Sequence, residues 1–403
     1  MQDNHFKELS TPIILLMALA CGLCTGSNYY SQPLLNSIAV DFGVEKTSAA
    51  YISFIAQTLY TVGLFFLVPL GDMFDKKKII IIFMALAACG QFLCAFSTTL
   101  QVMYLGTAIS SLFSIGAQVL IPFSTTLVKP ERSAKVVGIL MSGLLMGILM
   151  ARTVAGFLST IVSWHTVYIL SGLMLAFVSV LLFCKLPSVA PQKIVYSHML
   201  KTMYHFLKNE PLLQKRSILG SLCFAAVSTV FTTMALVLSE PPYYFNDFQI
   251  GLIGLVGIVG VLLGPWAGQL FQKGLERQWT HYAICLLVLS WIILWGAQTH
   301  LFIYLTGLMM LYVAISILHI LNQNTVYQID LNSRSRLNSI YMTIYFSGAA
   351  FGSFCAIRIW HYWGWQGCCI FGLGMAISCL LVNSLWKIQA PLTSTSRTIH
   401  CDL

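Results

Sequence analysis

The chain has 403 residues, of which 58% are apolar and only 9% are charged, whereas an average soluble domain has about 25% charged residues. A soluble fold cannot bury that much apolar surface, so the composition excludes a soluble protein and predicts an integral membrane protein. The net charge of +9 does not indicate a nucleic-acid partner, because the basic residues cluster in short loops between long apolar segments.

Twelve apolar segments are long enough to cross a hydrocarbon core, which takes about 20 helical residues. The first six are expected at 12–34, 47–70, 78–97, 101–127, 135–159 and 165–185, and the second six at 216–238, 248–271, 280–298, 300–326, 336–358 and 364–386. The predicted fold is therefore an all-α membrane protein with twelve transmembrane helices in two six-helix bundles. The first ten residues lack the features of a cleaved secretory signal, so we expect the first helix to be retained.

The distribution of Lys and Arg predicts the orientation of these helices. Nineteen of the 22 basic residues fall in loops or tails on one side if every segment crosses once. The positive-inside rule makes that side cytoplasmic. We therefore expect both termini, Lys77, Lys201 and Arg334 on the inside of a bacterial inner membrane. Asp41, Lys46 and Asp247 are expected on the outside.

The long polar interruption at 186–215 divides the chain into similar halves. The predicted units are an N-terminal bundle at 1–185, a cytoplasmic linker at 186–215, a C-terminal bundle at 216–390 and a cytoplasmic tail at 391–403. A shift of 201 residues places Gly147 on Gly348, Trp164 on Trp365 and Gln118 on His319. Repeat-built transporters bind substrate between their halves near the middle of the bilayer.

The loop after the second predicted helix carries the most specific motif. It reads Leu70-Gly71-Asp72-Met73-Phe74-Asp75-Lys76-Lys77-Lys78. This loop resembles the hallmark loop between helices 2 and 3 of the major facilitator superfamily, although Val68, Met73 and Asp75 depart from its pattern. The resemblance implies a conformational latch made of Gly71, Asp72, Lys76 and Lys77. In it, Asp72 would face the N-terminus of helix 11, where free backbone N–H groups favour an anion.

Two further stretches extend the resemblance over nearly the whole chain. Lys129-Pro130-Glu131-Arg132 is similar to the punctuation between helices 4 and 5 of the superfamily, and 27–44 resembles bacterial efflux permeases of the drug/proton antiporter and arabinose-efflux type. The resemblance implies a secondary transporter. In helix 5, however, Ala151-Arg152 stands where drug antiporters have a Gly-Pro pair, which weakens the transfer of their mechanism.

Arg152 is the deepest predicted charge. It lies 17 residues after Lys135, or about 25 Å along a helix, so its head group cannot easily reach water. An arginine at such depth normally faces a cavity or a partner. We expect Arg152 to bind an anionic group of the substrate; the alternative is an anchor that donates to carbonyl groups of a neighbouring helix. Arg358 lies beside an interfacial aromatic belt and is expected to snorkel.

Polar residues on helices 1, 4, 7 and 10 are expected to line a central cavity. They are Asn28, Tyr30, Gln32, Gln118, Thr232, His319, Asn322 and Gln323. All acids fall in loops, tails or helix ends, so no deep carboxylate is predicted to carry protons. His319 is the candidate for proton coupling, because small changes of environment move histidine across physiological pH; a neutral, hydrogen-bonded His319 is the alternative.

The predicted function is proton-coupled efflux of a small organic compound by a monomer in the lipid bilayer, and an anionic, siderophore-like or drug-like molecule is the candidate substrate. An importer of a small anionic metabolite would use the same residues. A membrane-embedded enzyme is a distant alternative, because neither a metal motif nor a pair of catalytic carboxylates is found. No cofactor or metal is predicted, and the lack of a Walker A sequence argues against ATP as the direct energy source.

Overall fold

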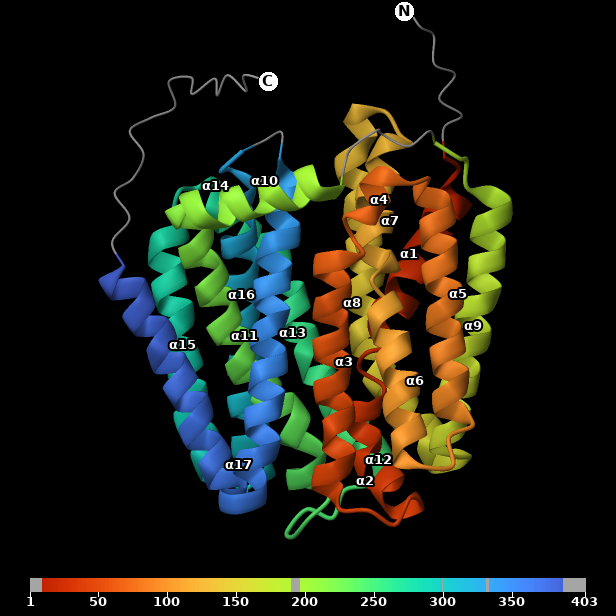
Figure 1. Cartoon of the computed structure of the whole chain (residues 1–403). Coiled ribbons are helices and arrows are strands. Elements are labelled where there is room, and N and C mark those ends of the chain that lie inside the picture. The colour runs from red at the N-terminus through yellow and green to blue at the C-terminus, as the bar shows by residue number, and fades with distance from the viewer. Residues whose placement is uncertain (1–8, 190–195, 299, 331–332, 387–403) are drawn as a thin grey trace, which may run out of the picture.

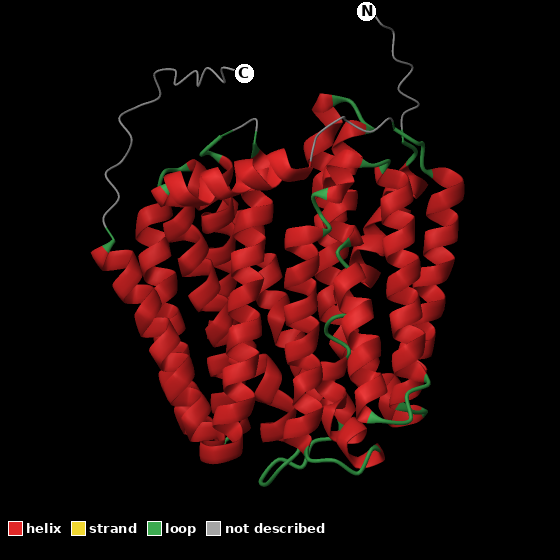
Figure 2. Cartoon of the chain, in the orientation of Figure 1, coloured by secondary structure: helices red, strands yellow, loops and turns green. Residues whose placement is uncertain are grey.

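The computed structural model describes residues 9–189, 196–298, 300–330 and 333–386. Helices make up nearly all of this part of the chain, which contains no strand (Figure 2). The elements in chain order are α1 (Thr11–Gly26), α2 (Ser31–Asp41), α3 (Lys46–Phe66), α4 (Leu70–Met73), α5 (Lys76–Ala95), α6 (Leu100–Phe113), α7 (Gly116–Thr126), α8 (Pro130–Ile161), α9 (Trp164–Lys185), α10 (Tyr196–Asn209), α11 (Pro211–Leu238), α12 (Asp247–Ile253), η1 (Gly254–Gly257), α13 (Ile258–Leu262), α14 (Gly264–Gln272), α15 (Glu276–Trp295), η2 (Gly296–Gln298), α16 (Leu301–Tyr327) and α17 (Arg334–Leu385).

Most predicted membrane spans coincide with observed helices to within a few residues. In the described residues, ten helices are long and apolar enough to cross a membrane, or eleven if the bent pair α1 and α2 is one span. The last of these, α17, contains Gly364 in a non-helical conformation (φ 57°, ψ −151°) where two helices meet. Counting its two arms separately would bring the number to the expected twelve, which itself stays a prediction.

Three predicted spans are interrupted rather than continuous. The first bends by 46° between α1 and α2, the fourth is split into α6 and α7, and the eighth consists of α12, η1, α13 and α14. In the eighth span, Gly254, Gly257 and Gly260 follow one another closely, and glycine weakens a regular helix. Interrupted spans are found in membrane proteins where backbone lines a functional site or is covered by neighbouring protein.

Close glycine contacts occur at equivalent places in the two halves. A Cβ atom added to Gly147 of α8 would lie 2.2 Å from the carbonyl oxygen of Gly22 in α1. Likewise, a Cβ atom on Gly348 of α17 would lie 2.1 Å from the carbonyl oxygen of Ser221 in α11. Small residues at these crossings let the backbones touch, as is common for helices in lipid. The predicted repeat thus pairs α1–α8 with α11–α17.

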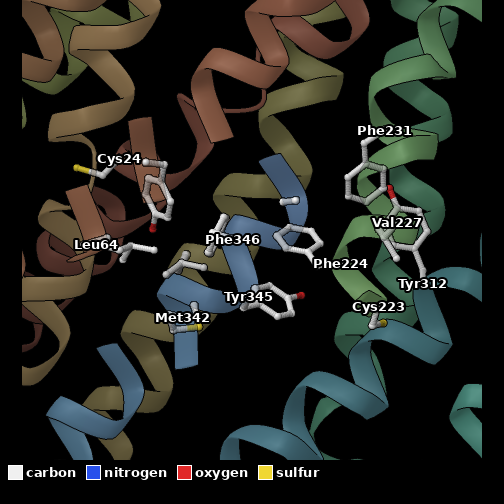
Figure 3. Packing of buried hydrophobic residues seen from close by; sticks show 14 of the residues in the cluster. Cys24, Leu64, Cys223, Phe224, Val227, Phe231, Tyr312, Met342, Tyr345 and Phe346 are labelled. Atoms are coloured by element: carbon white, nitrogen blue, oxygen red, sulfur yellow. The ribbon is translucent and has the colours of Figure 1, made fainter. Parts of the chain in front are cut away.

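The helices α1–α9, here called the N-terminal half, lie beside α11–α17, the C-terminal half (Figure 1). The halves meet along α3 and α17, where Phe54 contacts Phe354 and Tyr60 contacts Phe346, with ring centroids 5.3 Å and 4.6 Å apart. They also meet where α8 packs on α12 and η1. Buried apolar side chains from both halves continue this contact (Figure 3).

The helix α10 lies across one end of the bundle, here called the α10 face, and α2 and α12 lie at the opposite face (Figure 1). The helix α10 occupies part of the predicted linker, and α11 begins at Pro211, earlier in the chain than expected. Met199 and Met203 of α10 are buried, and Tyr196 donates a hydrogen bond to the carbonyl oxygen of Phe66 (3.1 Å). Arg216, the first residue of the expected seventh span, lies within α11, and its side chain is buried.

Candidate functional site

Arg152 of α8 is completely buried where the two halves meet. Its Nε donates to Oε1 of Gln32 in α2 (2.7 Å), and its Nη1 donates to the hydroxyl of Tyr312 in α16 (2.8 Å). The guanidinium also lies over the rings of Tyr29 (5.1 Å) and Phe231 (4.2 Å). Two of these four partners belong to each half, so this cluster, here called the Arg152 cluster, joins the halves.

The fold brings the C-terminal half unusually close to Arg152. A Cβ atom on Gly251 of α12 would lie 2.6 Å from the carbonyl oxygen of Arg152, and one on Gly254 would lie 3.1 Å from its Cδ. The lack of side chains at these positions lets the interrupted eighth span touch α8. On the other side of α8, the break between α1 and α2 places Gln32 in the first turn of α2.

The charge of Arg152 is only partly compensated. Its Nη2 is buried without a hydrogen-bond partner, and no carboxylate among the described residues lies within ion-pair distance of it. An aromatic ring attracts a desolvated guanidinium, but more weakly than a carboxylate does. The N–H groups of Nη2 are therefore unused donors that an anionic oxygen would satisfy.

The carboxylate of Asp247 is buried between the two halves at the face opposite α10. Asp247, the first residue of α12, is 5% exposed and accepts hydrogen bonds from Ser37 of α2 (2.5 Å) and Ser159 of α8 (2.6 Å). Gly156 allows this contact, because a Cβ atom there would lie 2.2 Å from the carbonyl oxygen of Asp247. A groove of about 400 Å³ at the surface is lined by both serines. Asp247 thus joins the two halves beside this groove, a contact here called the seal.

His319 and Gln118 approach the contact between the halves from opposite sides. Gln118 donates to the hydroxyl of Tyr60 (3.2 Å), whose ring packs on Phe346. The His319 Nδ1 lies 3.3 Å from the hydroxyl of Tyr341, and its ring centroid is 4.7 Å from that of Tyr345. Phe346, Phe224 and Tyr345 pack against one another (Figure 3). These rings connect Tyr60 to His319.

The other predicted cavity residues contact partners within their own half and do not join the Arg152 cluster. Asn28 donates to Ser114 (2.8 Å), Thr232 donates to Ser353 (2.9 Å), and Gln323 donates to Asn338 (3.1 Å). The ring of Tyr30 meets that of Tyr168 edge-on, and Asn322 accepts from Arg216 (3.2 Å). A direct role of these residues in substrate binding stays a prediction.

The predicted latch loop is only partly described. Gly71 and Asp72 belong to α4, and the side chain of Asp72 lies outside the described part of the structure. Lys76 begins α5, and Nζ of Lys77 lies 5.1 Å from the centroid of the Phe183 ring. Asp75 caps α5 by accepting from the backbone N–H of Lys77 (3.0 Å), a common role of aspartate at a helix N-terminus.

Phe231, Tyr312 and Asp247 were not among the site residues predicted from the sequence. The two aromatic residues lie in uniformly apolar segments, and no sequence signal separates them from core residues. Asp247 was assigned to the outside because it stands at the start of a span; its capping asparagine Asn246 marks the helix start but not the burial. No group of three or more potential metal ligands occurs among the described residues.

A helical bundle of this size, with interrupted spans and polar groups between two repeated halves, is the architecture of a membrane transporter. The sequence profile of the Major Facilitator Superfamily matches residues 17–353. The chain therefore belongs to the major facilitator superfamily and is a multi-pass membrane transporter of that family.

Known proteins agree with this assignment. The chain is 41% identical over 382 residues to a protein of Escherichia coli O157:H7 named "uncharacterized transporter YgaY", covering 94% of this chain and 96% of the relative. The structure is similar to that of the nucleoside transporter NupG (TM-score 0.75, 14% identity, 93% of this chain and 99% of that chain). It is also similar to the human organic anion transporter MFSD10 (TM-score 0.67, 13% identity, 93% and 100%). At these identities, the two structures support the fold alone.

Proposed function

We propose that this chain is a secondary active transporter of the bacterial inner membrane that recognises an anionic group of a small organic substrate through Arg152. The observation that carries the proposal is the unpartnered, buried Nη2 of Arg152 between the halves. An uncompensated guanidinium is expensive within a membrane. An anionic substrate would supply the missing acceptor, and a planar guanidinium is well suited to a carboxylate or phosphate.

The partners of Arg152 suggest how binding would couple to alternating access. The Tyr312 hydroxyl and the Phe231 ring cover the guanidinium from the C-terminal half. Because the guanidinium is completely buried, a substrate anion can reach Nη2 only if a side chain that covers it moves. Substrate binding would therefore change the contact between the halves and favour a state with a different separation of α8 from α11 and α16.

For the energy source and direction, we propose proton-coupled export by a monomer, with both termini in the cytoplasm. His319 is the proposed proton carrier, because it lies near the contact between the halves beside the hydroxyl of Tyr341. Import of a similar anion would use the same contacts in the opposite direction. Flux in sealed vesicles under an imposed pH gradient of either sign distinguishes the two directions.

The test of the recognition role uses purified protein in proteoliposomes, with counterflow of a panel of organic anions and cations. Arg152→Gln should abolish counterflow of the anion that the wild type transports, while the protein still elutes as a single species. Arg152→Lys keeps the charge but loses the planar fork, and should weaken apparent affinity at least about tenfold, corresponding to one charged hydrogen bond. The matched control is Arg358→Gln, which removes the same charge from an exposed position in α17.

Normal counterflow of every compound by Arg152→Gln would refute the recognition role. Counterflow that is lost equally in Arg358→Gln would show that loss of any membrane-embedded charge is damaging, and would also count against it. If Arg152→Gln fails to accumulate while Arg152→Lys accumulates and transports normally, Arg152 is a structural anchor and the proposal is wrong.

A further inference from the structure

A small cavity lies inside the N-terminal half, where α1 and α2 are separated by the break at 27–30. It offers about 10 Å³ of room to the centre of a water-sized sphere. About 10–15 Å³ by this measure is the minimum that holds one water molecule. Its lining is mostly polar and consists of Ser27, Asn28, Ser31, Ile52, Ala56, Gln91, Cys94, Thr107, Ser110, Ser111 and Tyr168.

Three side chains that line this cavity have buried polar atoms without a hydrogen-bond partner. These atoms are Oδ1 of Asn28, Oε1 of Gln91 and the hydroxyl of Tyr168, and each side chain is at least nine-tenths buried. Buried polar atoms in proteins nearly always have a partner. Three unmet atoms around one cavity therefore indicate a ligand in it.

The remaining hydrogen bonds of these side chains define what the ligand must offer. The Asn28 amide nitrogen donates to Ser114 Oγ (2.8 Å), and the Gln91 amide nitrogen donates to Ser110 Oγ (2.5 Å). Both amide oxygens are thus left as acceptors. The Tyr168 hydroxyl is free to donate. The ligand must donate two hydrogen bonds, accept one and be no larger than a single heavy atom.

We propose that this cavity holds one ordered water molecule, which donates to Asn28 Oδ1 and Gln91 Oε1 and accepts from the Tyr168 hydroxyl. Buried waters typically make about three such bonds to otherwise unsatisfied groups. A metal cation fits less well, because no carboxylate lines the cavity and a buried ion would bring an unpaired charge.

This water ties three separate segments of the N-terminal half together. Asn28 lies in the break between α1 and α2, Gln91 lies in α5, and Tyr168 lies in α9. The helix α2 that follows the break carries Gln32 and Ser37, which contact Arg152 and Asp247. The water thus fixes the break from which the N-terminal contribution to both sites extends.

The test compares two tyrosine-to-phenylalanine variants in the full-length protein. Tyr168→Phe removes the hydroxyl proposed to bind water, and Tyr304→Phe removes a hydroxyl that is also buried and unpartnered but does not line the cavity. If the cavity is filled, Tyr168→Phe should lower the melting temperature in detergent by about 1–2 °C, the result expected from losing one hydrogen bond of about 1 kcal/mol in a chain of this size. Tyr304→Phe should leave it unchanged or raise it.

An unchanged or raised melting temperature of Tyr168→Phe would overturn the proposal, because removal of an unsatisfied hydroxyl from a dry site is neutral or stabilising. An equal decrease in both variants would also overturn it, since the effect would then not depend on the cavity. The melting temperature of the wild type should be the same in NaCl and in choline chloride. A higher melting temperature in NaCl alone would show that a cation, and not water, occupies the cavity. A density map at high resolution should show one spherical peak within hydrogen-bond distance of all three atoms.

Discussion

Replacing Asp247 by alanine should separate the two halves at the face opposite α10 and so make the surface between them more accessible. The substitution removes two hydrogen bonds between the halves, from Ser37 (2.5 Å) and Ser159 (2.6 Å). Bonds of a hydroxyl to a carboxylate contribute about 1.5–3 kcal/mol each, but burial of the carboxylate partly offsets this gain. We expect a net shift of about 1–3 kcal/mol, or roughly 5- to 150-fold in the ratio of open to closed molecules.

The assay is the rate of maleimide labelling at a single cysteine introduced at Thr153, in a background without native cysteines. Thr153 lies on the sealed surface, because its hydroxyl donates to the carbonyl oxygen of Gly251 (3.1 Å). Labelling of the purified protein should accelerate by the factor given above when Asp247 is replaced. The matched control is Asp41→Ala, which removes a carboxylate from the same face whose contacts, with Trp164 and His165, remain within the N-terminal half.

Equal labelling of the Asp247→Ala variant and its parent would refute the assignment of Asp247 to the seal. Faster labelling in both Asp247→Ala and Asp41→Ala would refute it too, because the effect would follow the loss of any acid at this face. Asp247→Asn refines the result: an amide keeps the size but loses the charge, so its labelling rate should lie between those of the parent and the alanine variant.

Three further predictions test the packing, the orientation and the latch. Gly147→Leu should prevent accumulation of folded protein, because a Cβ atom would lie 2.2 Å from a backbone oxygen, whereas Gly138→Ala, with nothing within 4 Å, should accumulate normally in the membrane fraction. In intact cells, an impermeant reagent should label a cysteine at Lys46 and spare one at Lys201; strong labelling at Lys201 would reverse the proposed orientation. Asp72→Asn should leave the melting temperature intact and change accessibility at the two faces, since a charge–dipole contact between the halves would be lost; unchanged accessibility would leave Asp72 without a latch role.

The helices were predictable because each depends on a local property of the chain. A run of apolar residues about 20 long must form a helix in lipid, where each backbone group needs an internal partner. The interruptions were not predictable in the same way. The break before Ser31 follows the polar stretch 27–30, and the 3₁₀ segment Gly254–Gly257 begins and ends with glycine. The continuous helix α8 also contains glycine and polar residues, so such residues do not by themselves mark an interruption. The interruptions are held by contacts with neighbouring helices, which a single sequence does not display.

The candidate site was predictable only in its charged centre. Arg152 is conspicuous because it is a charged residue deep in an apolar segment. Gln32 was predictable as a site residue because it lies in the polar stretch at the end of the first span. Tyr312 and Phe231 come from the other half, more than 70 residues away in the chain, so their role depends entirely on tertiary packing. Asp247 shows the same limit, because a residue at the end of a span is ordinarily solvated, and only the approach of Gly156 buries it.

One pair of helices carries both the proposed binding charge and the seal. On α8, Arg152 and Ser159 are separated by Gly156, and on the facing span Gly251 and Asp247 meet the same surface. Arg152 and Ser159 are seven residues apart, about 10 Å along a helix, so movement of α12 away from Ser159 must also loosen the glycine contacts at Arg152. Because packed interfaces rearrange between discrete states rather than deform continuously, we expect the Asp247 contacts to be lost and the guanidinium to be exposed in the same transition. An anion bound at Nη2 would thus be released toward the opposite face by the movement that breaks the seal.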